Sequence, residues 1–369
     1  MIDLLLLIFF CTIFAYVIQS RTFEYTCTRA GIKKDRQSKV IYIGIFVAFI
    51  LFAGLRSSYN DTQTYMHAYS LCEVNNIKIS TLFEPYGGYD LYQQLLKKYI
   101  SENPQVFIFV TAIITNSLFL SFYVRHTRRY CDSIFLYSIG IYIFSMAGLK
   151  QAIAMGISLY AIDSYLKHKY IKALALLFLA TTFHPYIICI ICIPLLKEKV
   201  WDIKTVLIIL VCIIAFANLE SVLGLFSIIG KDYSDQGFDS YTINPIRVLV
   251  ESIPVVISLI YRKKINKSRN SVLILGINMK IISFIFIAMG LFMNPIYLGR
   301  MASYFTVLTS VAIPDMLAIC WKKERNGEVL IKAYYIFFLI YFLMDLTKIG
   351  SINLLTDQFN HVSIIDLLK

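Results

Sequence analysis

The sequence predicts an all-α fold, a polytopic integral membrane helical bundle of about twelve transmembrane segments without a soluble domain. Of the 369 residues, 58% are hydrophobic and only 16% are charged, and the mean hydropathy is +0.67. A soluble domain carries about a quarter charged residues. The apolar runs continue for roughly 15–22 residues, which is the length of a membrane-spanning helix and not the short alternation of a barrel strand.

The whole chain, residues 1–369, is expected to form a single transmembrane domain. The predicted spans are residues 2–19, 40–55, 104–124, 133–149, 151–166, 171–183, 185–196, 205–229, 245–261, 271–292, 301–320 and 329–347. The first span carries Asp3 where a signal peptide carries basic residues, so we expect it to be retained. Two spans between 171 and 196 are too short to cross the roughly 30 Å hydrocarbon core upright. Residues 171–196 are expected to form either a short helical hairpin or two thinned spans.

Lysine and arginine gather in short clusters between the spans. The clusters are Arg21/Arg29/Lys33/Lys34/Arg36/Lys39, Arg125/Arg128/Arg129, Lys167/Lys169/Lys172, Lys197/Lys199/Lys204, Arg262/Lys263/Lys264/Lys267/Arg269 and Lys322/Lys323/Arg325. All of them fall on one side of the predicted arrangement, which the positive-inside rule identifies as the cytoplasm, with both termini outside. This distribution explains the net charge of +12 and argues against nucleic-acid binding, because the basic residues do not share one soluble face.

The predicted outer side carries two loops of interest. The longer one, residues 56–103 between the second and third spans, is polar and rich in tyrosine, and the loop 230–244 carries Asp232, Asp235 and Asp239.

Cys189 and Cys192 form a C-x-x-C inside an apolar run with no second pair. We therefore predict neither a metal site nor a cofactor.

Ionisable side chains at the outer ends of the spans are the main functional signal, because charged groups at membrane depth are costly. They comprise the cations Arg56, Lys150 and Arg300 together with Asp61, Glu84 and His184. Such a cluster suits a substrate with a diphosphate at the membrane surface. Structural explanations stay open: a cation can snorkel to the interface, an aspartate can cap a helix, and a lone histidine can be satisfied by neighbours. Arg247 is ranked below these residues, and Lys280 inside a span needs a partner that the sequence does not name.

Two further patterns concern tyrosines. Asn60-Asp61-Thr62 is expected to begin a helix that places Tyr65 and Tyr69 on one face. Arg300 and Tyr304 are one turn apart and are expected to share a face. The tyrosines of the long outer loop suit the binding of sugar rings, although tyrosine is also normal at a membrane interface. They are Tyr59, Tyr65, Tyr69, Tyr86, Tyr89 and Tyr92.

At these residues the sequence resembles the EpsG family of polysaccharide polymerases, which are relatives of the Wzy O-antigen polymerases. Three stretches carry the resemblance: GLRSSYNDTQTYMHAY (54–69), KQAIAMGISLYAIDSYLKHKYIKALALLFLATTFHPY (150–186) and GRMASYF (299–305). The second stretch is similar to a basic-Gln-x-x-Ala opening and an Ala-x-x-Phe-His ending. Lys150 stands where the family usually has arginine, which keeps the charge but loses the bidentate fork.

The resemblance implies a GT-C-like polymerase in the bacterial inner (cytoplasmic) membrane, with its active site on the periplasmic or extracytoplasmic face. It implies transfer of a growing glycan from undecaprenyl diphosphate to the non-reducing end of a lipid-linked repeat unit, in O-antigen (lipopolysaccharide), capsule or exopolysaccharide biosynthesis. No cofactor or metal is implied. The implied partners are undecaprenyl-diphosphate-linked oligosaccharides, membrane lipid and a chain-length regulator protein.

The hypothesis assigns roles to the outer residues. Arg56, Lys150 and Arg300 would hold diphosphate oxygens, and Asp61 or His184 would accept the hydroxyl proton. The residues that would orient sugars or cations are Glu84, Gln151, Tyr65 and Tyr304.

Other functions remain open at this point. A flippase of lipid-linked oligosaccharide should show paired repeats and charges near the midplane, whereas this sequence has no repeat, and its candidate functional charges lie mostly at the outer ends of the spans, with Lys280 the main exception. An O-acyltransferase would use a histidine such as His184, and an O-antigen ligase usually has a longer loop between later spans. A purely structural protein gives no reason for three cations at the outer ends of spans.

Overall fold

The computed structural model describes residues 2–22, 36–74, 78–127, 129–217, 243–292, 295–345 and 359–367. The described residues are helical apart from turns and one isolated bridge, so the all-α prediction is confirmed for them. Asp232, Asp235 and Asp239 of the predicted outer loop lie outside the described residues.

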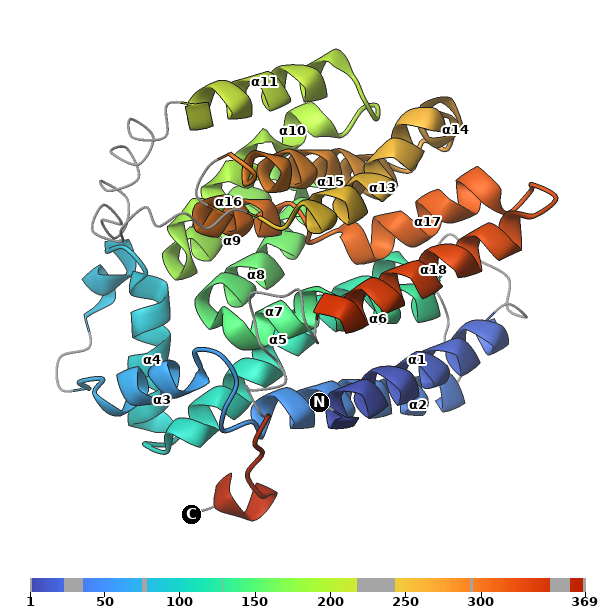
Figure 1. Ribbon diagram of the computed structural model, residues 1–369. Helices are drawn as coiled ribbons and strands as arrows, with labels where there is room; N and C mark the ends of the chain where they lie inside the picture. The colour runs from blue at the N-terminus through green and yellow to red at the C-terminus, as the bar shows by residue number, and fades with distance from the viewer. Residues whose placement is uncertain are drawn as a thin grey trace. The chain divides into compact units, whose positions relative to one another are not determined.

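The chain divides into two compact units, which are described separately. The first unit comprises Met1–Tyr160, Thr182–His184 and Phe342–Lys369, and the second comprises Ala161–Thr181 and Pro185–Tyr341. Helices that begin in the first unit are α1 (Ile2–Thr22), α2 (Arg36–Gly54), α3 (Thr62–Ser70), η1 (Ile79–Phe83), α4 (Gly87–Tyr99), α5 (Pro104–His126), α6 (Tyr130–Ile139), α7 (Ile141–Ala147), α8 (Leu149–Leu166) and η4 (Ile364–Leu367) (Figure 1). Those that begin in the second are α9 (Tyr170–Phe183), η2 (Pro185–Cys192), α10 (Ile193–Leu196), α11 (Ile203–Ala217), α13 (Pro245–Ile260), α14 (Arg262–Lys267), α15 (Ser271–Met289), α16 (Pro295–Tyr304), α17 (Thr309–Trp321) and α18 (Gly327–Met344).

Several helices are long and apolar enough to cross a membrane. Among the described residues there are 5, or up to 6 if α16 and α17, which meet at 69°, form one broken span. The 5 are Ile2–Ser20, Pro104–His126, Tyr130–Ala147, Ser271–Met289 and Gly327–Met344. Shorter apolar helices are Val40–Gly54, Tyr170–Phe183, Pro185–Leu196 and Ile203–Ala215. The chain is therefore a helical membrane protein, whereas the predicted count of about twelve spans is not confirmed.

The helices of the first unit pack side by side and leave apolar surface outside. Helix α1 lies along α6 and α2, and α2 lies along α5. The outer side of α1 carries large exposed hydrophobic side chains, namely Leu6, Phe9, Phe10, Ile13 and Phe14. Lipid is the solvent that such a surface on a membrane-length helix requires.

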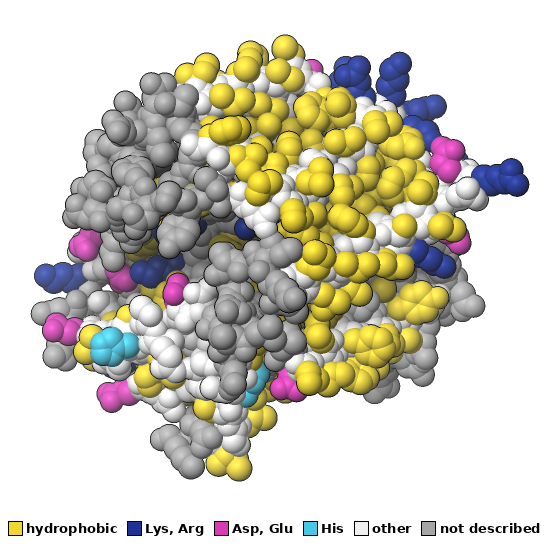
Figure 2. Space-filling view, viewed as in Figure 1, with side chains coloured by type: hydrophobic (Ala, Val, Ile, Leu, Met, Phe, Trp, Pro, Cys, Tyr) yellow, Lys and Arg dark blue, Asp and Glu magenta, His cyan; other side chains and the backbone are white. Residues whose placement is uncertain are grey.

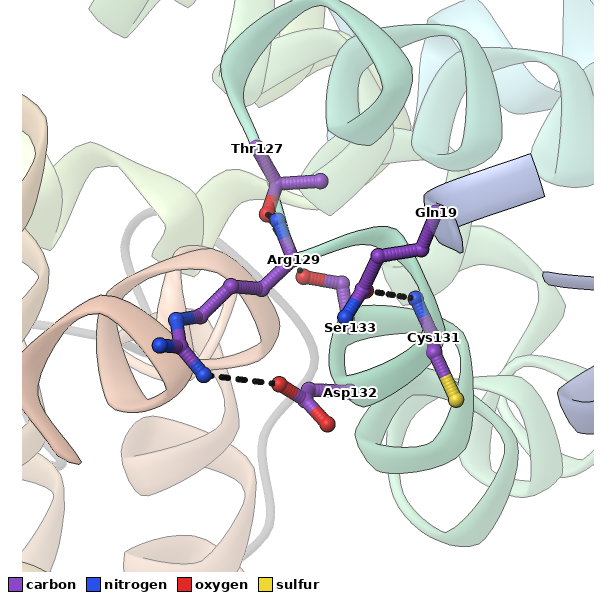
Figure 3. Close-up of polar contacts among 6 residues, drawn as sticks. All are labelled: Gln19, Thr127, Arg129, Cys131, Asp132 and Ser133. Atoms are coloured by element: carbon purple, nitrogen blue, oxygen red, sulfur yellow. Dashed lines mark hydrogen bonds and ion pairs between the residues drawn. The ribbon is translucent and has the colours of Figure 1, made fainter. Parts of the chain in front are cut away.

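One end of the first unit carries the turn between α5 and α6 (Figure 3). The last turn of α1 meets it there, since the Cys131 backbone N–H donates to Gln19 Oε1 over 2.9 Å. The Thr127 hydroxyl accepts the Arg129 backbone N–H at 3.0 Å, and Arg129 pairs with Asp132 at 3.4 Å. Arg129 and the end of α1 therefore lie at the same end of the first unit, which is the arrangement that the positive-inside rule predicts for their two clusters.

Helix α5 separates this basic turn from the residues of the candidate site. Its 23 residues correspond to a length of about 35 Å. Arg125 lies in its last turn, whereas Gln105 at its first turn donates to the carbonyl of Arg56 at 3.0 Å. Arg56 and the basic turn therefore lie at opposite ends of the first unit.

Four basic clusters gather at one end of the second unit. Lys264 pairs with Glu324 at 2.6 Å, and the backbone N–H of Val200 donates to Asn266 Oδ1 at 2.7 Å. Lys197 Nζ lies 4.8 Å from the ring centroid of Tyr165. These contacts join the clusters 167–172, 197–204, 262–269 and 322–325. Figure 2 shows dark blue side chains beyond the edge of a hydrophobic face, near α14.

The intramembrane Lys280 has an acidic partner in the structure. Lys280 on α15 forms an ion pair with Glu251 on α13, and their side chains are 7% and 22% exposed. A buried charge is tolerated only when it is paired and hydrogen-bonded. The partner that the sequence did not name is therefore Glu251.

Replacing Lys280 by methionine is expected to lower the stability of the protein by about 3–5 kcal/mol, because the carboxylate of Glu251 then remains without its counter-charge. Heat-induced unfolding of the purified protein in detergent measures this loss. The double variant Glu251→Gln/Lys280→Met should lose less than Lys280→Met alone. Lys332→Met, at an exposed position of α18, is the matched control, and equal stability of Lys280→Met and the control would contradict the prediction.

Candidate active site

The carboxyl end of α2 shows how Arg56 is held. The last carbonyls of a helix have no partner within the helix and must be satisfied from outside. Arg56 Nη1 donates to the carbonyl of Ala53. Gln105 Nε2 donates to the carbonyls of Gly54 at 2.8 Å and of Arg56 itself at 3.0 Å. Arg56 and Gln105 therefore cap α2 with their side chains.

The remaining donors of Arg56 reach two other elements. Its Nε donates to Thr62 Oγ1 at 3.2 Å, and its Nη2 donates to the carbonyl of Met146 at 3.0 Å. The arginine thus joins the end of α2 to the start of α3 and the end of α7. Burial lowers the pKa of Arg56 to about 10, which leaves the guanidinium charged at neutral pH.

This arrangement bears on the predicted phosphate contact of Arg56. The residue is 1% exposed, and three of its nitrogens donate to the protein. A group with this little exposure does not touch a ligand in the described conformation. The structure therefore favours a positioning role for Arg56, which sequence reasoning missed because caps by distant side chains have no local signature.

Asp61 follows the Arg56 turn and begins α3. The helix over Thr62–Ser70 confirms the predicted start, but Asp61 makes no side-chain capping hydrogen bond. The alternative explanation that the Asp61 carboxylate only caps this helix is therefore not supported by the structure. The Asp61 side chain is exposed, so its carboxylate faces the surroundings of the site.

The tyrosines of the outer segment are mainly core residues. Tyr69 stacks on Phe107 with ring centroids 4.7 Å apart, and Tyr65 and Tyr89 pack against the same cluster. The predicted shared face of Tyr65 and Tyr69 is thus confirmed. Tyr59, Tyr69, Tyr86 and Tyr89 are buried, so their rings present no open face to a sugar. Among the six tyrosines, only Tyr65 and Tyr92 are partly exposed.

Gly87 and Gly88 allow the segment before α4 to fold tightly. A Cβ on Gly87 would lie 1.6 Å from the carbonyl oxygen of Thr81, and a Cβ on Gly88 would lie 2.1 Å from Thr182 Oγ1. Only glycine permits both approaches. Tyr86, just before them, adopts a left-handed conformation with φ 63°. The pair of glycines therefore decides where the Tyr86 side chain lies.

Tyr86 links two of the predicted site residues. Its ring meets that of His184 edge to face, with centroids 5.3 Å apart and planes at 88°. Lys150 Nζ lies 5.0 Å from the ring centroid of Tyr86 and 4.6 Å from that of Tyr89. These distances are typical of cation–π contacts. We call Lys150, Tyr86, Tyr89 and His184 the Lys150 cluster.

The other predicted residues of the first unit surround this cluster. Glu84 is exposed two residues before Tyr86, and Gln151 is buried beside Lys150 in the first turn of α8. Tyr65 lies 6.5 Å from Tyr89, measured between ring centroids. The carbonyl of Met146, to which Arg56 donates, lies four residues before Lys150. The structure thus brings the predicted residues of the first unit to one end of that unit.

Arg300 and Tyr304 belong to the second unit and lie on α16. Arg300 is exposed, whereas Tyr304 is 0% exposed. Helix α16 runs without a break over Pro295–Tyr304, so the two residues lie one turn apart on it as expected, although one side chain is exposed and the other is buried. Their part in the site remains a prediction.

The comparison with known families decides the assignment. The model of the EpsG family matches residues 39–359. The chain belongs to the EpsG family. EpsG is related to the Wzy-like polymerases, and the match contains every predicted site residue, from Arg56 to Tyr304. Membership therefore indicates a membrane polysaccharide polymerase-like role. No curated protein and no solved structure matches the chain.

Proposed function

We propose that this EpsG-family protein is a repeat-unit polymerase. It transfers a growing glycan from undecaprenyl diphosphate to the non-reducing end of a second lipid-linked repeat unit. The observation that carries the proposal is the Lys150 cluster, in which a cation and an imidazole both contact the ring of Tyr86, at the end of the first unit opposite its basic turn. By the positive-inside rule the basic turn faces the cytoplasm, so the proposed site faces the other side.

The reaction requires positioning and charge stabilisation. The acceptor hydroxyl oxygen forms a bond to the anomeric carbon of the growing glycan, and the bond from that carbon to the diphosphate oxygen breaks. Undecaprenyl diphosphate leaves with the electron pair, and the hydroxyl proton passes to a base on the protein. A diphosphate is already a good leaving group, so a fixed cation that stabilises its negative charge supplies much of what the step needs.

We propose a division of roles among these residues. Lys150 contacts diphosphate oxygens, while Tyr86 and Tyr89 hold its ammonium group in place. Arg300, which is exposed, is proposed as a second cation for the leaving group. Asp61 and His184 are the two candidate bases: Asp61 offers an exposed carboxylate, and His184 offers a buried imidazole beside Tyr86. Glu84, Gln151, Tyr65 and Tyr304 are proposed to orient sugars or the cations.

A deletion strain complemented with single variants tests this function. His184→Ala and Arg300→Ala are expected to insert normally, to lose long glycan chains and to leave single repeat units on the final lipid acceptor. The glycan chain-length profile, read beside the amount of protein in the membrane, checks both points. A strain that lacks the protein and carries no repeat unit at all would indicate a flippase instead. Normal chain length in Arg300→Ala would remove that arginine from the site.

A further inference from the structure

The C-terminal segment 359–362 pairs with the chain that follows α2. Arg56 and His361 form an isolated antiparallel bridge. The Ser57 backbone N–H donates to the carbonyl of Asn360 at 2.7 Å, and the Val362 backbone N–H donates to the carbonyl of Leu55 at 2.8 Å. The segment is therefore hydrogen-bonded on both sides of Arg56, the residue that joins α2, α3 and α7.

Aromatic side chains reinforce this pairing. Phe359 stacks on Tyr59 with ring centroids 4.4 Å apart and planes at 14°, and it also packs on Phe52 at 5.3 Å. His361 Nε2 lies 3.1 Å from the carbonyl oxygen of Phe52. Because a carbonyl only accepts, the imidazole donates and satisfies another terminal carbonyl of α2. The segment thus completes the cap that Arg56 and Gln105 begin.

The turn under Phe359 has an unfavourable backbone. Tyr59 and Asn60 are successive residues with φ 144° and 46°. Residues other than glycine rarely adopt such positive φ angles. Such conformations persist only where surrounding contacts hold them. Phe359 supplies one of these contacts, because it covers the ring of Tyr59, which is 2% exposed. Asp61, a candidate base, directly follows Asn60.

We propose that the segment 359–362 is a positioning segment for the polymerase site. It holds the turn from Arg56 to Asp61 in the conformation that presents the Asp61 carboxylate and keeps Arg56 on the carbonyl of Met146. The catalytic consequence rests on the proposed function. The family match ends at residue 359, so Asn360, His361 and Val362 lie outside it.

The test compares Phe359→Ala with Phe359→Tyr in the full-length protein, purified and assayed with a lipid-linked repeat unit. Phe359→Ala is expected to lower kcat roughly tenfold to a hundredfold with little change in KM, because small displacements of reacting groups have effects of this size. Phe359→Tyr keeps the stacked ring and should retain activity within about twofold, since its aromatic face is unchanged. Phe292→Ala, at a side chain that is 87% exposed in the second unit, is the matched control.

A second pair of variants separates the loss of this contact from misfolding of the protein. His361→Gln keeps a donor for the carbonyl of Phe52 and should retain activity, whereas His361→Ala should lose it at equal protein abundance. Wild-type kcat in both Phe359→Ala and His361→Ala would overturn the positioning role. If the wild-type protein itself failed to join repeat units, the proposed function would fail instead, so the two failures are distinguishable.

Discussion

Lys150→Met is expected to abolish long glycan chains while the protein remains in the membrane at its normal level. Methionine keeps much of the length of the side chain but removes the charge that would stabilise the leaving diphosphate, and we expect a loss of at least about a hundredfold. The Lys150 ammonium lies against the rings of Tyr86 and Tyr89, and methionine also packs well on aromatic rings. The glycan chain-length profile and the membrane abundance measure the two effects.

Two controls sharpen this result. Lys150→Arg keeps the charge, can also lie over the aromatic rings, and is expected to retain most of the activity. Tyr86→Phe keeps the ring against Lys150 and His184, whereas Tyr86→Leu removes it and should shorten the chains. Long chains in Lys150→Met would show that the cation is not required and would sink the proposed role of the Lys150 cluster.

Arg56→Met is expected to reduce both stability and activity. The substitution leaves the carbonyls of Ala53 and Met146 without the donors that Arg56 supplies, and each unsatisfied buried group costs about 1–3 kcal/mol. It also releases Thr62 at the start of α3. The temperature of heat-induced unfolding in detergent and the abundance of the protein in the membrane should both fall. Lys150→Met, in contrast, should leave the membrane abundance at its normal level.

Arg56→Lys separates charge from geometry at the same position. A lysine keeps the positive charge, but its compact ammonium cannot reproduce the planar fork that reaches three separate acceptors. We therefore expect Arg56→Lys to be destabilised almost as much as Arg56→Met. Wild-type stability in either variant would contradict the capping role and would return Arg56 to the set of direct phosphate ligands.

Much of the fold could be read from the sequence because hydropathy acts locally. The span over Pro104–His126 and the start of α3 at Thr62 both follow from short runs of neighbouring residues. The number of spans was harder to predict from the sequence. It depends on the bend of 69° between α16 and α17 and on the 3-10 helix over Pro185–Cys192, and packing determines both features.

Sequence alone is enough to predict that this protein is a helical membrane protein, where its basic clusters lie along the chain, and which family it resembles. Each of these follows from composition summed over about 20 residues or from short motifs. The burial of Arg56 as a cap, the contact of Lys150 with Tyr86 and the ion pair of Lys280 with Glu251 became visible only in the folded protein. The reason is that partners distant in sequence are chosen by the packing of whole helices, which no local pattern encodes.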